Sequence, residues 1–174
     1  MLYIRPLVPS DSGQVLLLNA ESQPKVAALD RAELDRLQSI SHDHIVAEDG
    51  KLICGYLLSF AREDAYDGEE FVILRTLISQ PFVYIDQIAI LGSLQRSGIG
   101  RRLYGVLEHT AMLRGACFLC CEVNTAPPNP GSLAFHRRLG FDSVGSFATR
   151  DGRNVELLRK RLSVAAQQIA GADA

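Results

Sequence analysis

Residues 82–107, FVYIDQIAILGSLQRSGIGRRLYGVL, contain the junction that decides the fold. The first part is an apolar run typical of a buried strand, and the last part has the spacing of an amphipathic helix. Between them, Gly98 and Gly100 lie at the first turn of the expected helix, where unpaired backbone N–H groups attract anions. Glycine keeps these amides accessible, and Arg96 and Arg101 add positive charge. The junction therefore predicts a site for a phosphate or pyrophosphate group.

The glycine pair also has other interpretations. Two glycines at this spacing could simply let a strand and a helix pack closely together. A dinucleotide-binding loop would need a third glycine and an earlier place in the chain. A nucleoside triphosphate loop would need Gly-Lys followed by Ser or Thr, where this chain has Gly100-Arg101-Arg102. The sequence therefore matches neither of these two nucleotide-binding motifs.

The elements that follow the junction predict a parallel pair of strands. A helix over 99–115 leads into an apolar strand over 115–124, and a strand–helix–strand order implies a right-handed crossover with parallel pairing. The inner face of this helix is expected to carry Leu103, Val106, Leu107, Thr110 and Ala111.

The rest of the chain alternates between element types within one domain over residues 1–162. We expect a strand over 2–7, helices over 10–22 and 29–40, a hairpin over 44–60 turning at Asp49-Gly50, a helix over 131–140 and a hairpin over 142–162 turning at Asp151-Gly152. Residues 61–81 suggest a loop carrying a short helix, which suits either a substrate-side segment or a solvated connection. The tail, residues 163–174, is expected to fray.

Composition limits the class of protein. Of the 174 residues, 47% are hydrophobic and 22% are charged, as in an ordinary soluble globular domain. The formal net charge of -2 at pH 7 does not suggest a surface for nucleic acid, and no apolar run suggests a membrane span or a secretory leader. We therefore expect a cytoplasmic protein without nucleic-acid or membrane partners.

The four cysteines, Cys54, Cys117, Cys120 and Cys121, do not predict a metal site. Cys117 and Cys120 have CxxC spacing, but a structural zinc site needs about four ligands. The chain offers no second CxxC and no suitably spaced pair of histidines. We expect small buried thiols in a core strand instead.

Two motifs resemble those of the GNAT superfamily of acyl-CoA N-acyltransferases. The family signature Q/R-x-x-G-x-G/A after the fourth strand is matched by Gln95, Gly98 and Gly100. A second pattern, N-x-x-A/S-x-x-F/L-Y-x-x-x-G-F, is matched in register by Asn129, Ser132, Phe135, Gly140 and Phe141, with His136 at the tyrosine position. The resemblance implies an α/β (α+β) fold: a mixed, mostly antiparallel sheet of six to seven strands, flanked by helices and split between its two central parallel strands. It also implies acetyl-CoA as the cofactor.

The same resemblance implies roles for individual residues in binding acetyl-CoA. The backbone of Ile88 and Ile90 would pair with the pantetheine arm, and amides from Gln95 through Arg101 would hold the pyrophosphate. Asn129 and Ser132 would orient the pantetheine or cap the following helix. Phe135 would line the thioester channel or pack in the core. The implied cofactor-binding positions are Ile88, Ala89, Ile90, Gln95, Arg96, Ser97, Gly98, Ile99, Gly100, Arg101, Asn129, Ser132 and Phe135.

Three residues are candidates for the chemistry. Acyl transfer to an amine needs a base, because a free alkyl amine has a pKa near ~10.4. Asp86 is the preferred base and Glu122 the second candidate, although either carboxylate could be a solvated or salt-bridged strand residue. His136 stands where many family members have a tyrosine that protonates the departing thiolate, so it could donate that proton or simply pack.

These residues suggest direct acetyl transfer from acetyl-CoA to a primary amine of a small molecule or peptide. The alternatives are an acyl-CoA-binding regulatory domain without catalysis and a nucleotide-binding protein unrelated to acyl transfer. The last hairpin is a candidate surface for a homodimer.

Overall fold

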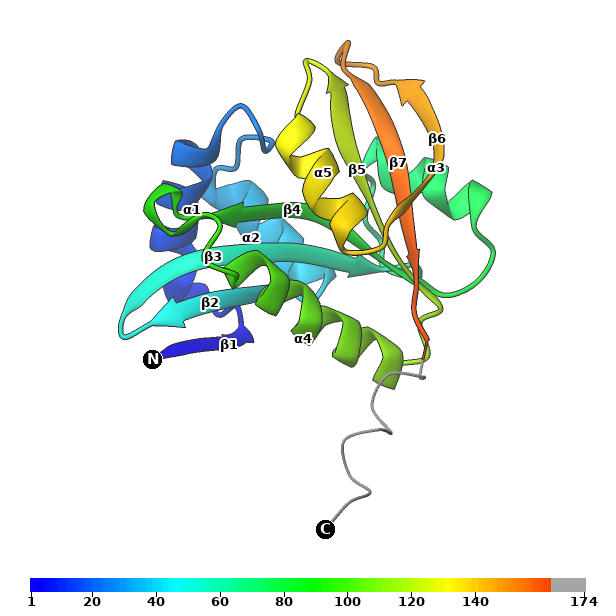
Figure 1. The fold of residues 1–174 in the computed structure, drawn as a ribbon. Helices are drawn as coiled ribbons and strands as arrows, with labels where there is room; N and C mark the ends of the chain where they lie inside the picture. The colour runs from blue at the N-terminus through cyan, green and yellow to red at the C-terminus, as the bar shows by residue number, and fades with distance from the viewer. Residues whose placement is uncertain (164–174) are drawn as a thin grey trace.

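A computed structural model describes residues 1–163. Within these residues, seven strands form one sheet in the order β1-β2-β3-β4-β5-β7-β6, and only the β4–β5 pair is parallel (Figure 1). The strands are β1 (Leu2–Pro6), β2 (Ile45–Asp49), β3 (Leu52–Ala61), β4 (Phe82–Ile90), β5 (Phe118–Ala126), β6 (Asp142–Ala148) and β7 (Asn154–Arg161). The expected mixed, mostly antiparallel sheet is confirmed. The predicted tail lies outside the described residues, except for Ser163.

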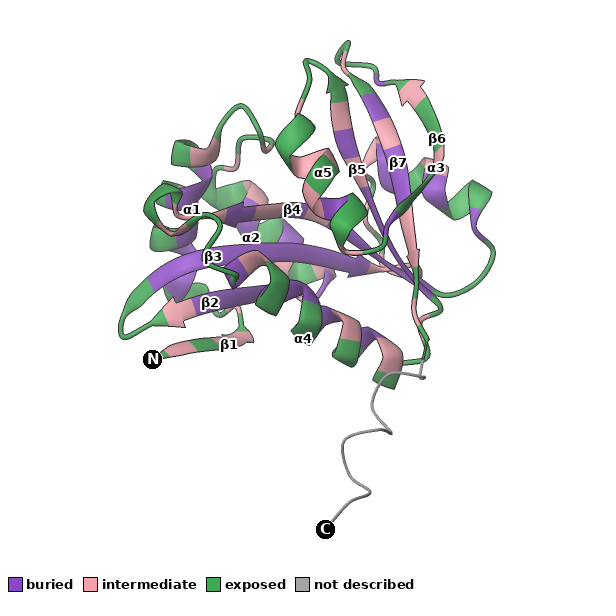
Figure 2. Cartoon of the chain, in the orientation of Figure 1, coloured by how far each residue is buried: buried purple, intermediate pink, exposed green. Residues whose placement is uncertain are grey.

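Helices cover both faces of the sheet. They are α1 (Ser12–Ser22), α2 (Arg31–Ile40), α3 (Glu69–Leu77), α4 (Ile99–Leu113) and α5 (Pro130–Arg138), with 3-10 turns at Pro9–Asp11 and Gly92–Leu94. One apolar cluster joins α1, α2 and α3 to the sheet, and a second joins α4 and α5 to its other face. Figure 2 shows the buried strands between these two layers.

Local sequence signals explain where the helices begin. The Asp30 side chain accepts a hydrogen bond from the Glu33 amide at 2.8 Å, which caps α2. The Asn129 side chain accepts one from the Ser132 amide at 3.2 Å, and Pro130 follows as the first residue of α5. The capping role considered for Asn129 is therefore observed.

The predicted inner face of α4 is wrong at two positions. Val106 and Thr110 are exposed, whereas Tyr104 is fully buried. The buried residues of α4 are Ile99, Leu103, Tyr104, Leu107 and Ala111. The buried stripe thus follows steps of four residues from Ile99, and this rotation brings the tyrosine into the core.

The sheet splits between β4 and β5. These strands pair only from Phe82 opposite Phe118 to Ile85 opposite Cys121. Beyond that point β4 continues along β3 and β5 continues along β7. The inner edge of β4 is therefore open from Asp86 onward, as the family resemblance implied.

A β-bulge in β4 puts two consecutive side chains on the same face of the sheet. Leu58 lies opposite Gln87 while Ser59 lies opposite Ile85, so Asp86 is an extra residue on β4. Asp86 contacts Tyr66, and Gln87 contacts Asn19 on α1, so these consecutive side chains share the face covered by α1, α2 and α3. Asp86 lies on this face by alternation from Tyr84, and the bulge brings Gln87 onto the same face.

Two further features complete the fold. Cys54, Cys120 and Cys121 are buried as expected, but Cys117 is exposed, because it lies in the turn before β5. Within residues 1–163, the helices are too short or too polar to cross a membrane.

Candidate functional site

The first turn of α4 presents free backbone amides to solvent. Gly98 has φ 93° and lies immediately before the helix, and Arg96 has φ 64°. Among residues 1–163, no acceptor is bound to the amides of Arg96 or of residues 98–101. The amides of Gln95 and Ser97 instead donate to the carbonyls of Gly92 and Leu94, both at 3.3 Å. Five of the seven amides expected to hold a pyrophosphate are thus available to an anion.

The two glycines of the junction have different structural roles. Gly98 adopts a backbone conformation that L side chains rarely take, and a Cβ there would meet no atom within 4 Å. A Cβ on Gly100 would lie 3.2 Å from Cζ of Phe135 on α5. Gly100 therefore allows close packing of α4 against α5, whereas the nearest strand atom, Cδ1 of Ile88, would lie at an ordinary 3.9 Å, so neither glycine serves the strand–helix packing considered for the pair.

The open edge of β4 leads from the split toward this turn. The amide of Leu91 donates to the Cys54 carbonyl at 2.9 Å, so the Leu91 backbone faces β3. Because backbone directions alternate along a strand, Ile88 and Ile90 face the open edge, whereas Ala89 faces β3. The Gln95 side chain donates to the Ile90 carbonyl at 3.4 Å. Two of the three predicted β4 backbone positions thus point into the split.

His136 lies on the face of the sheet covered by α4 and α5, and only 3% of its surface is exposed. Its Nδ1 is 2.8 Å from the Ser132 carbonyl, which can only accept, so Nδ1 carries the proton. Its Nε2 then accepts from the Tyr104 hydroxyl at 2.6 Å. Burial lowers the pKa of His136 and raises that of Tyr104 well above its usual value. The pair is therefore neutral near pH 7.

Asp86 and Glu122 lie on the opposite face, each beneath a tyrosine. The Tyr66 hydroxyl donates to Asp86 and the Tyr84 hydroxyl donates to Glu122, both at 2.6 Å. Both carboxylates are partly exposed, whereas Tyr84 is almost fully buried. The structure brings the two predicted bases together from neighbouring strands at the point where those strands separate.

Both carboxyl groups hold their protons more tightly than usual. Burial raises the pKa of Asp86 to about 6, and the nearby charge of Glu70 adds to this effect while the Tyr66 hydrogen bond opposes it. Burial, followed by the charges of Asp86 and Glu70, raises the pKa of Glu122 well above its ordinary value. The two groups therefore interact as they titrate, and the pKa of Asp86 lies near the pH at which a base would work.

Tyr66, Tyr104 and Arg153 are site residues that the sequence analysis missed. Arg153 donates to Oε1 of Glu70 at 3.0 Å and to Oδ1 of Asn124 at 3.1 Å, joining α3 to β5. Of these three, only Tyr104 carries a signal in the sequence: its hydroxyl would need a hydrogen-bond partner if the side chain were buried.

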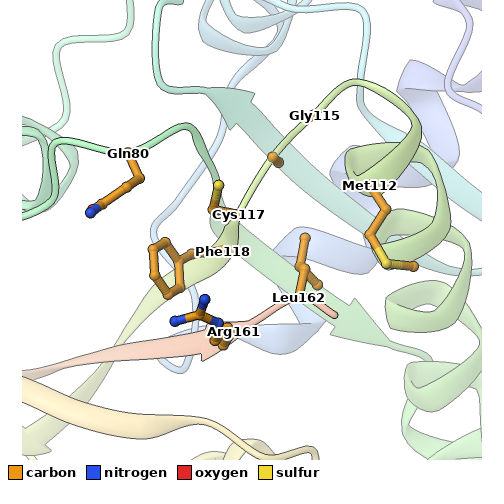
Figure 3. Close-up of a pocket in the computed structure, with 8 residues that line it drawn as sticks. Gln80, Met112, Gly115, Cys117, Phe118, Arg161 and Leu162 are labelled. Carbon is orange, nitrogen blue, oxygen red and sulfur yellow. The ribbon is translucent and has the colours of Figure 1, made fainter. Parts of the chain in front are cut away.

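A cavity of about 350 Å³ lies elsewhere, at the C-terminal end of α4 (Figure 3). Its lining comprises Gln80, Met112, Gly115, Ala116, Cys117, Phe118, Arg161 and Leu162. None of the predicted site residues lines it. The predicted site residues lie instead along the open edge of β4 and on the two faces of the sheet next to that edge.

Three solved structures share the fold over nearly the whole chain. The ribosomal-protein-S18-alanine N-acetyltransferase from Escherichia coli is 16% identical with a TM-score of 0.70, covering 97% of this chain and 99% of that chain. Naa20 of Chaetomium thermophilum, solved with a bisubstrate analogue, is 19% identical with a TM-score of 0.74 over 92% and 86%. The yncA protein of Salmonella typhimurium, solved with its cofactor acetyl-CoA, is 17% identical with a TM-score of 0.68 over 98% and 99%. At these identities the likeness shows the fold alone.

Sequence comparison gives the family. No curated protein matches the chain significantly. The model of the acetyltransferase (GNAT) family matches residues 15–141, which is more than half of the chain. The protein therefore belongs to the GNAT acetyltransferase family.

Proposed function

We propose that the chain transfers an acetyl group from acetyl-CoA directly to a primary amine of a small molecule or peptide. The main observation in support is that Asp86 and Glu122 lie on neighbouring strands at the point where β4 and β5 separate. The open backbone of Ile88 and Ile90 begins at the same place and leads toward the free amides of α4. This arrangement joins a site for a base to a site for a long phosphorylated ligand.

The residues present fit acetyl-CoA. Free amides at residues 98–101, with Arg96 and Arg101 beside them, suit a pyrophosphate. Ile88 and the amide of Ile90 offer backbone groups on the open edge to an extended pantetheine arm, while the Ile90 carbonyl already accepts from Gln95. The structure of yncA with acetyl-CoA supports this choice by analogy of fold. When bound, acetyl-CoA supplies the acetyl group as a thioester.

Asp86 would take the proton that the amine nitrogen loses, and Glu122 would share it. A base works best when its pKa lies near the working pH, and the pKa of Asp86 is raised to about 6. The names of the E. coli neighbour and the bisubstrate complex of Naa20 support an amine acceptor, including a peptide amine. Binding and alignment of the two substrates would supply much of the rate.

Release of coenzyme A tests this proposal. We expect free thiol to appear from acetyl-CoA at a rate that depends on added primary amine, measured across a panel of small amines and short peptides. Tight binding of coenzyme A without amine-dependent release would instead support a regulatory acyl-CoA-binding domain. The engagement of both ring nitrogens of His136 favours that second candidate.

His136 is the proposed proton donor to the departing thiolate. To donate, the imidazole must gain a proton on Nε2, where it now accepts from Tyr104, or turn its Nδ1–H away from the Ser132 carbonyl. We expect His136→Ala to lower kcat by about 10-fold or more while changing the Kd of coenzyme A little. Steady-state kinetics and calorimetry measure the two effects. Unchanged kcat at saturating substrate would remove His136 from the mechanism, and Tyr104→Phe serves as the control for loss of the buried hydrogen bond alone.

A further inference from the structure

The segment between β3 and β4 is much longer than their connection requires. Ala61 lies opposite Val83 in an antiparallel pair, and such strands can be joined by a two-residue turn. This chain instead inserts residues 62–81, which include α3. The insertion contributes Tyr66, stacked on Phe60 with ring centres 3.9 Å apart, and Glu70, which is 8% exposed. Both residues lie beside the carboxylates of the proposed active site.

The turn between β6 and β7 is fastened to this insertion. The Arg150 amide donates to Glu69 at 3.0 Å, and Arg153 donates to Glu70 at 3.0 Å. Arg153 also reaches Asn124 on β5, two residues beyond Glu122. We call Glu70, Arg153 and Asn124 the α3–β7 strap. The Glu70 side chain is 10% exposed and that of Arg153 34%, so solvent screens their ion pair less than an ordinary surface pair.

The opposite side of the site is also fixed. The side chains of Asn19 and Gln87 both donate to the Ala27 carbonyl, at 2.9 and 3.2 Å. The Asn19 side chain accepts from the Leu29 amide at 2.9 Å. The loop between α1 and α2 is thus tied to β4 next to Asp86. Hydrogen bonds thus hold both borders of the site to the sheet, so neither is free to move away and widen the site for an extended peptide.

The charges around the site favour a cation. Three carboxyl groups, Glu70, Asp86 and Glu122, interact with one another, and Arg153 is a cation close to Glu70 and Asp86. Arg153 is already paired with Glu70, so Asp86 and Glu122 have tyrosines rather than cations as their hydrogen-bond partners. An acceptor that brings its own positive charge would favour the ionised forms of Asp86 and Glu122, whereas a carboxylate near the reacting amine would disfavour them.

We propose that the acceptor is a small cationic amine, and that the α3–β7 strap excludes peptide chains. This inference rests on the proposed function and deepens it. It selects one of the two acceptor classes, although one structural neighbour is named for a protein acceptor and another was solved with a bisubstrate analogue.

An acceptor panel on the full chain tests the inference. We expect kcat/KM for a four-carbon diamine to exceed that for a four-carbon ω-amino acid by about 10-fold or more, and that for a peptide amine by at least as much. The double variant Glu70→Gln, Arg153→Gln removes the ion pair at nearly constant volume, and it should shrink the diamine-to-peptide ratio about 10-fold. The matched control is Arg31→Gln, Asp35→Asn, which removes an exposed pair on α2 and should leave the ratio unchanged.

The outcomes are separable. Peptide turnover by the unaltered protein that equals or exceeds diamine turnover would overturn this inference and leave acetyl transfer standing. An unchanged diamine-to-peptide ratio in the folded double variant would overturn the role of the strap in excluding peptides, and it would also leave acetyl transfer standing. If that variant fails to fold, as judged by thermal melting, Arg153→Lys replaces it, because it keeps the charge and loses the planar fork. The lack of turnover with every amine would overturn the proposed function itself.

Discussion

Gly98→Asp is expected to weaken coenzyme A binding about 100-fold, whereas Gly98→Asn should weaken it only a few-fold. Both side chains tolerate the left-handed backbone that Gly98 adopts at φ 93°, so the two variants share the same strain. They differ in charge. A carboxylate within about 4 Å of a bound pyrophosphate is repelled by up to ~4 kcal/mol at an effective dielectric constant of 20.

Titration calorimetry with coenzyme A measures this difference, and thermal melting without ligand checks that the two variants fold equally well. The gap between Asp and Asn should narrow as salt is added, because screening weakens repulsion between exposed charges. Equal affinities for the two variants would place the pyrophosphate elsewhere and would remove the anion site from α4.

Asp86→Asn is expected to lower kcat/KM by about 100-fold or more, the usual contribution of a general base. The Tyr66 hydroxyl can still donate to the amide oxygen, so the local geometry survives. In the unaltered protein kcat/KM should rise with pH through an apparent pKa near the value of about 6 expected for Asp86, because the base must be ionised. Glu70→Gln should shift that apparent pKa downward, since the negative charge of Glu70 helps to raise the pKa of Asp86.

Asp86→Asn is also expected to stabilise the fold above pH 6. The pKa of Asp86 is raised from 3.8 to about 6, so between these values the folded state holds a proton that the unfolded state has lost. Stability therefore falls as pH rises through that window, and the loss persists above it. Asp86→Asn avoids this loss, which at about 1.4 kcal/mol per pKa unit is at most ~3 kcal/mol.

Denaturant unfolding at pH 4 and pH 7.5 measures the effect, with Asp142→Asn on the exposed start of β6 as the control. A variant that loses activity and stability together at pH 7.5 would mean that Asp86 is a structural residue. A variant that keeps full activity would transfer the role of base to Glu122.

The order of elements could be read from local sequence because local chemistry sets it. Asp49-Gly50 and Asp151-Gly152 form turns whose glycines have φ 66° and 87°, and Gly98 precedes α4 at the expected place. The cofactor motif likewise consists of neighbouring residues. These features depend on backbone angles that a few residues determine by themselves.

The partners of the site residues could not be read in the same way. Tyr104 meets His136 across 32 positions of sequence, and Arg153 meets Glu70 across 83. The extra residue in β4 depends on pairing with β3, and it puts the side chains of Asp86 and Gln87 on the same face. Such contacts arise from packing between distant segments, so a single sequence indicated the two candidate bases without showing what surrounds them.

The inner edge of β4 has a consequence for how sequences of this fold can diverge. A ligand that pairs with the backbone of Ile88 and Ile90 reads peptide groups, which are the same whichever side chains they carry. Substitution along this strand can therefore proceed as long as strand geometry is kept. Neighbours that share only 16–19% of their residues with this chain nevertheless retain its architecture. Evolutionary drift in the side chains would leave the recognition of a slender, extended ligand intact, while acceptor preference changes around it.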